Sequence, residues 1–187
     1  MSTAKPYAGR VAKVILYVAT SLDGFIAEAD GGVSFLEPFQ VDGEDHGYAA
    51  FMAQVDTLAL GARTYEQAVS FGWEYGARPA FVFSRRELPV PPGADVRFVS
   101  GAVADVLPQL DGTVFLVGGA DLVRQFLEAR AIDELNLHVV PVLLGGGIPL
   151  FADPPFAEAE LTGTEAYSTG VVRLSYRLKG FDGRVPV

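Results

Sequence analysis

Residues 113–130, TVFLVGGADLVRQFLEAR, are the feature that most constrains the fold. The segment begins with four consecutive apolar residues at 114–117, which predict a short strand buried on both faces. Gly118 and Gly119 follow, and apolar residues then recur at helical spacing as far as Leu127. A strand, a glycine turn and a helix in this order leave main-chain N–H groups free to bind an anion, most often a phosphate. A plain tight turn explains the two glycines equally well.

Length and composition favour a single α/β domain over residues 1–187, with an ordered core at about 11–180. The absence of cysteine excludes disulfides, thiolate metal sites and a cysteine nucleophile. No segment resembles a signal peptide or a membrane span, so we expect a cytoplasmic protein without a membrane partner. Two histidines without a nearby acidic cluster predict no metal site.

The net charge of −9 argues against a nucleic-acid partner, because nucleic acid requires a basic surface. The charge still permits a small anionic ligand that is bound by a few of the eleven arginines. The expected partner is therefore a small molecule.

The distribution of apolar residues predicts a mostly parallel sheet with helices between its strands. Two alternating segments at the end of the chain, joined by a Ser-Thr-Gly turn, predict an antiparallel hairpin at the far edge of that sheet. Ser100 is the expected N-cap of the third helix. The predicted strands are 11–19, 57–60, 79–83, 96–100, 135–142, 158–167 and 171–179, and the further predicted helices are 43–55, 65–69 and 102–110.

Two other segments carry residues suited to phosphate binding. Gly61 ends a predicted strand and Arg63 and Thr64 begin the next helix, where a cation is unfavourable unless an anion compensates it. Ser84 and Arg85 follow the carboxyl end of another strand, which is where open α/β sheets bind ligands. Solvated arginines remain the alternative at both places. The glycine run 145–147 lacks the lysine of a P-loop and is interpreted as a bend.

Residues 20–32 form a loop with its own apolar anchors, Phe25 and Ile26, between Asp-Gly turn signals. Such a loop can close over a site. An ordinary surface hairpin is the alternative.

Four of these segments resemble, in order, the dihydrofolate reductase-like family: SLDGFIA, LGARTYE, FSR and VGGADLVRQFL. In particular the chain is similar to stand-alone relatives of the reductase domain of riboflavin biosynthesis, the deaminase-reductase C-terminal group. The likeness extends over residues 11–179. It implies a three-layer dihydrofolate reductase-like fold, a reductase that uses NADPH, and a homodimer for which the C-terminal hairpin is one possible contact.

The resemblance also implies roles for individual residues in binding NADPH. Gly61, Arg63 and Thr64 would contact the cofactor phosphates, and Ser84 and Arg85 would contact the adenosine 2′-phosphate. Gly118, Gly119 and Ala120 would contact the pyrophosphate. The backbone of Ala19 and Ile26 would bind the nicotinamide carboxamide. The peptide bond between Gly118 and Gly119 is expected to be cis. Ala62 stands where the family usually has an arginine, so one phosphate contact depends on Arg63 alone.

The resemblance further suggests a substrate site. The spacing of the family back from Gly61 reaches Asp45 as the catalytic carboxylate, with a helix-capping carboxylate as the alternative. Arg78 matches an arginine that binds a substrate carboxylate, and Asp23, Phe25 and Tyr48 are expected to line the site. The predicted reaction is hydride transfer to a pterin-like or aminopyrimidine-like ring. The alternatives are a dinucleotide-binding module without turnover and, less well supported by the phosphate-binding residues, a flavin protein.

Overall fold

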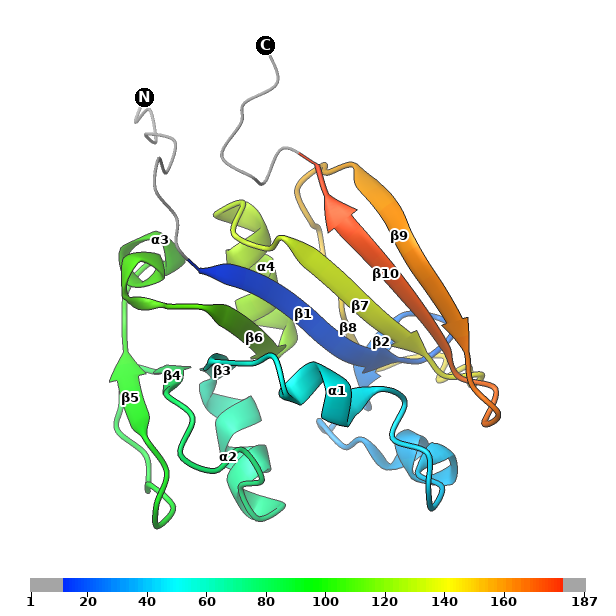
Figure 1. Cartoon of the computed structure of the whole chain (residues 1–187), viewed down its shortest axis with the longest axis horizontal. Coiled ribbons are helices and arrows are strands. Elements are labelled where there is room, and N and C mark those ends of the chain that lie inside the picture. The colour runs from blue at the N-terminus through cyan, green and yellow to red at the C-terminus, as the bar shows by residue number, and fades with distance from the viewer. Residues whose placement is uncertain (1–11, 180–187) are drawn as a thin grey trace.

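The strand β1 (Lys13–Thr20) lies inside an eight-stranded mixed sheet with the strand order β5-β4-β3-β6-β1-β7-β10-β9 (Figure 1). The computed structural model describes residues 12–179, so the predicted lead at residues 1–10 and the start of the first strand at Val11 lie outside the described residues. Six strands run parallel: β1, β3 (Thr57–Gly61), β4 (Ala80–Phe83), β5 (Val96–Val99), β6 (Thr113–Gly118) and β7 (Glu134–Val139).

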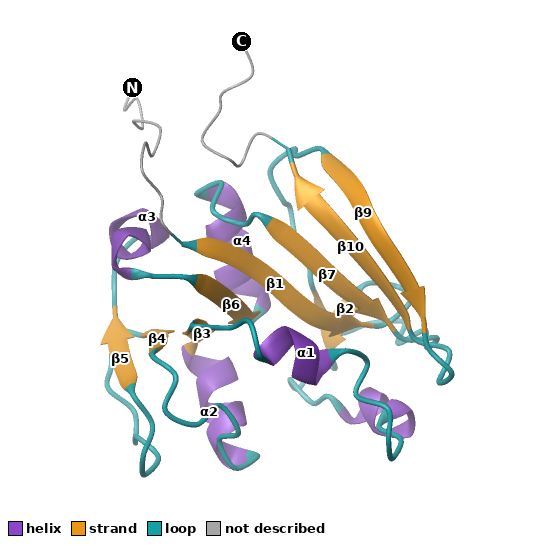
Figure 2. Ribbon diagram, viewed as in Figure 1, coloured by secondary structure: helices purple, strands orange, loops and turns teal. Residues whose placement is uncertain are grey.

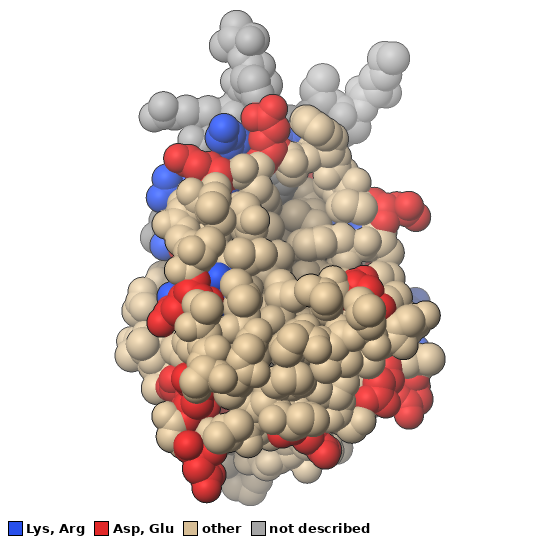
Figure 3. Space-filling model, turned by 90° about the vertical axis from the view of Figure 1, so that its right-hand side faces the viewer, with Lys and Arg blue, Asp and Glu red and all other residues tan. Residues whose placement is uncertain are grey.

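The C-terminal hairpin completes the sheet at one edge. Its strands, β9 (Ala159–Ala166) and β10 (Val172–Leu178), are antiparallel to each other, and β10 is antiparallel to β7. The side of the molecule next to this hairpin is largely uncharged at its centre, with acidic side chains around the margin (Figure 3). Leu161 of β9 is an exposed apolar residue of this hairpin. That a second copy of the chain covers this surface stays a prediction.

Helices cover both faces of the sheet and give the predicted three layers (Figure 2). On one face α1 (Tyr48–Met52) and α2 (Ala62–Ser70) pack in a core that contains Ile15 of β1. On the other face α3 (Val103–Val106) and α4 (Ala120–Glu128) pack in a core that contains Val14 and Leu16. Successive residues of a strand face opposite sides, so an apolar strand such as β1 serves both cores.

Two predicted helices are shorter than expected. The helix predicted over 43–55 is regular only in α1, because His46 and Gly47 before it have left-handed φ values of 53° and 81°. The helix predicted over 102–110 consists of α3 and the 3-10 helix η2 (Leu107–Gln109). The prediction that Ser100 caps it is wrong, since Ala102 occupies the N-cap position and no side chain caps α3.

The loop at residues 20–32 contains an unpredicted strand, β2 (Phe25–Ala27), which pairs with β8 (Ile148–Pro149) in a second, two-stranded sheet. The 3-10 helix η1 (Ser34–Phe39) follows it. The predicted bend at 145–147 is present, and Gly147, at φ 148°, has no room for a Cβ, which would collide with the carbonyl oxygen of Ala27. Within residues 12–179 no helix is long and apolar enough to cross a membrane.

Candidate functional site

The two glycine turns lie side by side at the carboxyl edge of the sheet. Strands β3 and β6 are parallel neighbours, with Leu60 opposite Gly118. A Cβ on Gly61 would stand 3.5 Å from the carbonyl oxygen of Gly118 and 3.6 Å from the amide nitrogen of Gly119. The peptide bond between Gly118 and Gly119 is cis, as the resemblance implied. The helices α2 and α4 therefore begin next to each other.

The starts of these helices suit an anion. Gly61 and Gly119 are the N-cap residues, and neither helix has a side-chain cap. The hydroxyl oxygen of Thr64 lies 3.2 Å from the position of a Cβ on Gly119, so a side chain there would crowd the first turn of α2. Uncapped N–H groups and the positive end of each helix dipole together form a ready anion site. The cradle fits a dinucleotide pyrophosphate because glycine leaves its surface open.

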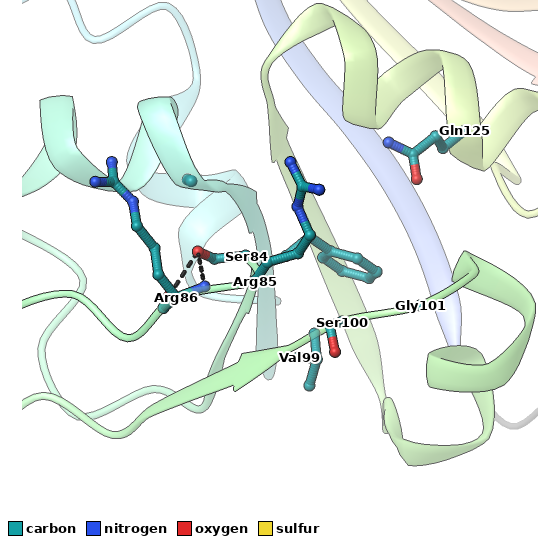
Figure 4. Close-up of a pocket in the computed structure, with 9 residues that line it drawn as sticks. Ser84, Arg85, Arg86, Val99, Ser100, Gly101 and Gln125 are labelled. Atoms are coloured by element: carbon teal, nitrogen blue, oxygen red, sulfur yellow. Dashed lines mark hydrogen bonds between the residues drawn. The ribbon is translucent and has the colours of Figure 1, made fainter.

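A cavity of about 610 Å³ adjoins this cradle and includes the first residue of α2 (Figure 4). Within residues 12–179 no acidic side chain forms an ion pair with Arg85, whereas Arg86 is bound to Glu66 at 3.0 Å. The guanidinium of Arg85 is therefore available to a ligand. The lining residues are Ala62, Phe83, Ser84, Arg85, Arg86, Val99, Ser100, Gly101 and Gln125.

The remaining predicted cofactor residues also lie near this edge, but Arg63 does not line the cavity. Ala19 is the penultimate residue of β1, which neighbours β6, and Ile26 of β2 packs against the core beneath. Ala120 is the first residue of α4. Arg63 is exposed on the first turn of α2 and does not line the cavity, so its phosphate contact stays a prediction.

The carboxylate of Asp45, two residues before the N-cap residue Gly47, binds main-chain N–H groups at the start of α1, which is the role that was the alternative to catalysis. Its carboxylate accepts hydrogen bonds from the main-chain N–H groups of Ala49 and Gly47, each at 2.9 Å. These bonds, the one from Ala49 first, lower the pKa of Asp45. A general acid needs a raised pKa. The geometry is that of a cap, and the catalytic role stays a prediction.

Asp23 ties the loop of residues 20–32 to the glycine run. Its carboxylate accepts hydrogen bonds from the Ser21 hydroxyl at 2.6 Å and from the N–H groups of Leu144 at 3.1 Å and Gly145 at 2.7 Å. These bonds, the one from Ser21 foremost, lower the pKa of Asp23 to about 2. Its oxygens are thus engaged in positioning the loop.

Arg78, the predicted anchor of a substrate carboxylate, is engaged by the protein itself. Its guanidinium donates to the main-chain carbonyls of Met52, Val55 and Tyr75 at 3.2–3.3 Å. It lies just before β4, whereas Ser84 follows that strand. Three of its five N–H donors are thus used by the protein, which leaves two for a carboxylate.

The sequence analysis expected Tyr48 in the site but missed the aromatic and polar side chains that surround it on the α1 face. The ring of Tyr17 stacks on Phe51 with centroids 4.2 Å apart and lies 4.4 Å from the ring of His138. Tyr48 lies beside Tyr17 at 6.1 Å and donates to Glu74. The available signal was that His46 directly follows Asp45, a predicted site residue, in the sequence.

Comparison with known proteins agrees with this geometry. The model of the RibD C-terminal domain family matches residues 99–173. The uncharacterized protein YwjB of Bacillus subtilis (strain 168) is 36% identical over 166 residues, which is 85% of this chain and 94% of that protein. The structure of a putative riboflavin biosynthesis protein from Shewanella sp. PV-4 aligns with a TM-score of 0.78 and 30% identity, covering 89% of this chain and 99% of that one.

A more distant structure defines the fold. Dihydrofolate reductase from Enterococcus faecalis, complexed with NADP(H), aligns with a TM-score of 0.63 and 15% identity over 89% of this chain and 96% of that one. The predicted dihydrofolate reductase-like fold is confirmed.

Proposed function

Because this chain belongs to the RibD C-terminal domain family, we propose that it is a reductase that uses NADPH to reduce a small heterocyclic substrate. The observation that carries the proposal is the junction of the two glycine turns with the arginine-lined cavity. Gly61 lies against Gly118 and Gly119, and Ala62, the residue after Gly61, lines the cavity that also contains Arg85. A phosphorylated dinucleotide needs such a set of donors on an otherwise acidic protein.

Different residues of the chain would bind different parts of the cofactor. The N–H groups at the starts of α2 and α4 bind the pyrophosphate, and the Thr64 hydroxyl is a further donor. Arg63 adds a positive charge near the phosphates from its exposed position on α2. Ser84 and Arg85 bind the 2′-phosphate, for which a planar guanidinium is well suited. The main chain of Ala19 and Ile26 orients the nicotinamide. Bound NADPH supplies the hydride.

The substrate would lie between the Phe25 strand and the α1 face, where the half-buried rings of Tyr17 in β1 and Tyr48 in α1 meet. Asp23 fixes the loop that carries Phe25, and this loop would exclude water from the reacting atoms. Protonation by Asp45 would require its capping bonds to weaken, so an ordered water is the alternative proton donor.

Titration with NADPH and NADH tests this proposal directly. We expect the fluorescence of the reduced nicotinamide to change on binding, and NADPH to bind at least about tenfold more tightly than NADH because of its additional phosphate. Failure of the purified protein to bind NADPH at millimolar concentration would refute the assignment.

A dinucleotide-binding module without turnover is the second candidate, and the capping geometry of Asp45 favours it. The two are separated by adding pterins, aminopyrimidines and quinoid compounds to the NADPH complex and following absorbance at the reduced-nicotinamide band. Tight binding of NADPH without oxidation across this panel would support the module, whereas steady turnover would exclude it.

A further inference from the structure

The segment that leads from the end of α2 to β4 contains three residues in the left-handed region (Figure 1). Gly72, Trp73 and Gly76 have φ values of 106°, 45° and 64°. Glycine adopts such values readily, but a bulky residue such as tryptophan rarely does, so the backbone at Trp73 is strained. Strain of this kind persists only where surrounding contacts enforce it, and it is concentrated in segments that bind ligands or move. We call residues 71–76 the strap.

The strap inserts two aromatic side chains into the core on the α1 face. Trp73 and Tyr75 are 9% and 8% exposed. The ring of Trp73 meets Tyr65 of α2 edge-on with centroids 5.5 Å apart, and the ring of Tyr75 lies 6.4 Å from that of Phe115 in β6. Phe115 in turn lies 6.3 Å from Tyr17, at the proposed substrate site. The strap is therefore part of the packing that borders this site.

A hydrogen bond at the surface joins the strap to α1. The hydroxyl of the half-buried Tyr48 donates to Oε1 of the exposed Glu74 at 3.1 Å. Burial, together with the nearby Tyr75 and Glu74, raises the pKa of Tyr48 well above its ordinary value, so the hydroxyl keeps its proton and stays a donor. We call this hydrogen bond the latch.

The strap satisfies its own buried polar group and has a fixed pivot at one end. The indole N–H of Trp73 donates to the carbonyl of Gly76 at 2.9 Å, so it keeps its partner if the strap moves as a unit. The guanidinium of Arg78, just beyond the strap, binds the carbonyl of Tyr75 and also that of Met52 in α1. Arg78 thus fixes the end of the strap next to Gly76.

The other end of the strap is held loosely. Phe71, directly before Gly72, is 72% exposed, so its side chain does not anchor this end in the core. Rotation about Gly72 meets no obstacle close to the chain, since a Cβ on this residue would meet nothing within 4 Å. Opening at this end therefore requires loss of the latch and of the aromatic packing.

We propose that the strap is a gate on the α1 face, which the latch between Tyr48 and Glu74 holds shut and which opens about Gly72 and Gly76 to admit the substrate. This inference rests on the proposed function, because the gate controls access to the proposed substrate site. Tyr48 belongs to both the latch and that site. A substrate that binds its hydroxyl competes with Glu74 and so favours the open gate.

Amide hydrogen exchange measures the opening directly. The N–H groups of Gly72 and Trp73 bind carbonyls in the last turn of α2. In the variant Glu74→Ala we expect both amides to exchange about threefold to tenfold faster than in the native protein, because the latch no longer opposes opening. The amide of Ala80 in β4 should exchange as before. Unchanged rates in the strap, or equal acceleration at Ala80 through global destabilisation, would overturn the gate.

Fluorescence gives a second readout, because Trp73 is the only tryptophan of the chain. We expect acrylamide to quench it about twofold more strongly or better in Glu74→Ala and in Tyr48→Phe, which keeps the ring. Glu74→Gln retains an acceptor oxygen and should behave as the native protein does. Glu160→Ala, which removes an exposed carboxylate from β9, is the matched control. Native quenching in both latch variants would contradict the proposal.

Steady-state kinetics connect the gate to the substrate site. For any pterin, aminopyrimidine or quinoid compound that the native protein reduces, Glu74→Ala should raise kcat/KM about threefold or more, because more of the protein is open. Faster strap exchange without this rise would show that the strap does not control access, and would overturn the gate. If the native protein reduces none of these compounds, the proposed function fails, whereas exchange and quenching still decide whether the latch holds the strap shut.

Discussion

The hydroxyl of Thr64 and the main chain of Gly119 meet across two helix starts, with the Thr64 oxygen 3.2 Å from the position that a Cβ on Gly119 would occupy. The two residues are 55 positions apart, and they meet because β3 and β6 are parallel neighbours whose carboxyl ends share an edge. Gly119 itself has an extended conformation, with φ −84° and ψ −163°, which any residue adopts. Space is therefore what favours glycine at this position.

This contact predicts that Gly119→Ala impairs cofactor binding more than folding. The added methyl group forces the Thr64 hydroxyl or the start of α4 to shift by a few tenths of an ångström. We expect NADPH affinity to fall by about tenfold or more, measured by fluorescence titration, because the helix N–H groups lose their alignment.

The matched control for this variant is Gly163→Ala in β9, where a Cβ meets nothing nearer than 3.8 Å. It should leave NADPH affinity unchanged. A Gly119→Ala protein that binds NADPH normally would show that the pyrophosphate does not approach this turn.

Arg85 is predicted to provide the preference for NADPH over NADH. Arg85→Ala removes a guanidinium that no acidic side chain among residues 12–179 binds, so we expect affinity for NADPH to fall by about tenfold to a hundredfold. Affinity for NADH should change little, since it lacks the 2′-phosphate. Arg177→Ala on β10, far along the sheet from the cavity, is the charge-matched control. Parallel losses for both cofactors would contradict this assignment.

Variants of Asp45 distinguish a helix-capping role of its carboxylate from a catalytic one. If its carboxylate is only a cap, Asp45→Asn keeps one side-chain oxygen, which can accept one of the two main-chain hydrogen bonds, so stability should fall only slightly and turnover should be nearly preserved. Asp45→Ala should lower stability modestly and leave the turnover of the folded protein intact. Urea denaturation and steady-state rates measure the two effects. Loss of turnover in Asp45→Asn without loss of stability would establish a catalytic carboxylate.

His138 predicts a pH dependence of stability. Burial lowers its pKa from 6.5 to about 4, and the nearby charges of Arg173 and His46 act in the same direction. As the pH falls, His138 therefore takes up a proton near pH 6.5 in the unfolded chain but only near pH 4 in the folded chain. Stability should fall as the pH is lowered between these values, by about 3 kcal/mol at most, and this contribution should level off below pH 4.

The variant His138→Gln isolates this effect from the titration of carboxylates. The difference in the free energy of unfolding between native protein and variant, measured by urea denaturation across the pH range, should change mainly between pH 4 and 6.5. A difference that does not depend on pH would mean that folding leaves the pKa of His138 unchanged.

Much of the cofactor cradle could be predicted from sequence because each part is local. An apolar strand, a glycine turn and an amphipathic helix follow one another within residues 113–130, and Gly61 repeats the pattern. Parallel strands then bring these turns to one edge without further information. The cis peptide bond at Gly118 followed from the resemblance alone.

The parts that were missed depend on contacts between distant segments. The strands β2 and β8 have three and two residues, too few for periodicity to indicate a strand. The side chains of Tyr17, His138 and Tyr167 all donate to the carbonyl of His46, from which they are 29, 92 and 121 residues away in the sequence. Arg78 shows a further limit, since the sequence could not indicate that three main-chain carbonyls engage its guanidinium.

The conformation of Gly147 leads to a prediction about the loop of residues 20–32, which is supported by the bend at residues 145–147. At φ 148° its backbone is in a region that is nearly restricted to glycine, and a Cβ would collide with the carbonyl oxygen of Ala27 in β2. We expect Gly147→Ala to lower the free energy of unfolding by about 2 kcal/mol or more. We also expect it to raise KM for the substrate, because β2 carries Phe25. The neighbouring Gly146→Ala is the control, since its Cβ meets nothing within 4 Å and its φ is not positive. Urea denaturation should leave that control within about 0.5 kcal/mol of the native protein. Equal stability of the two variants would show that β2 does not need the close approach of the bend.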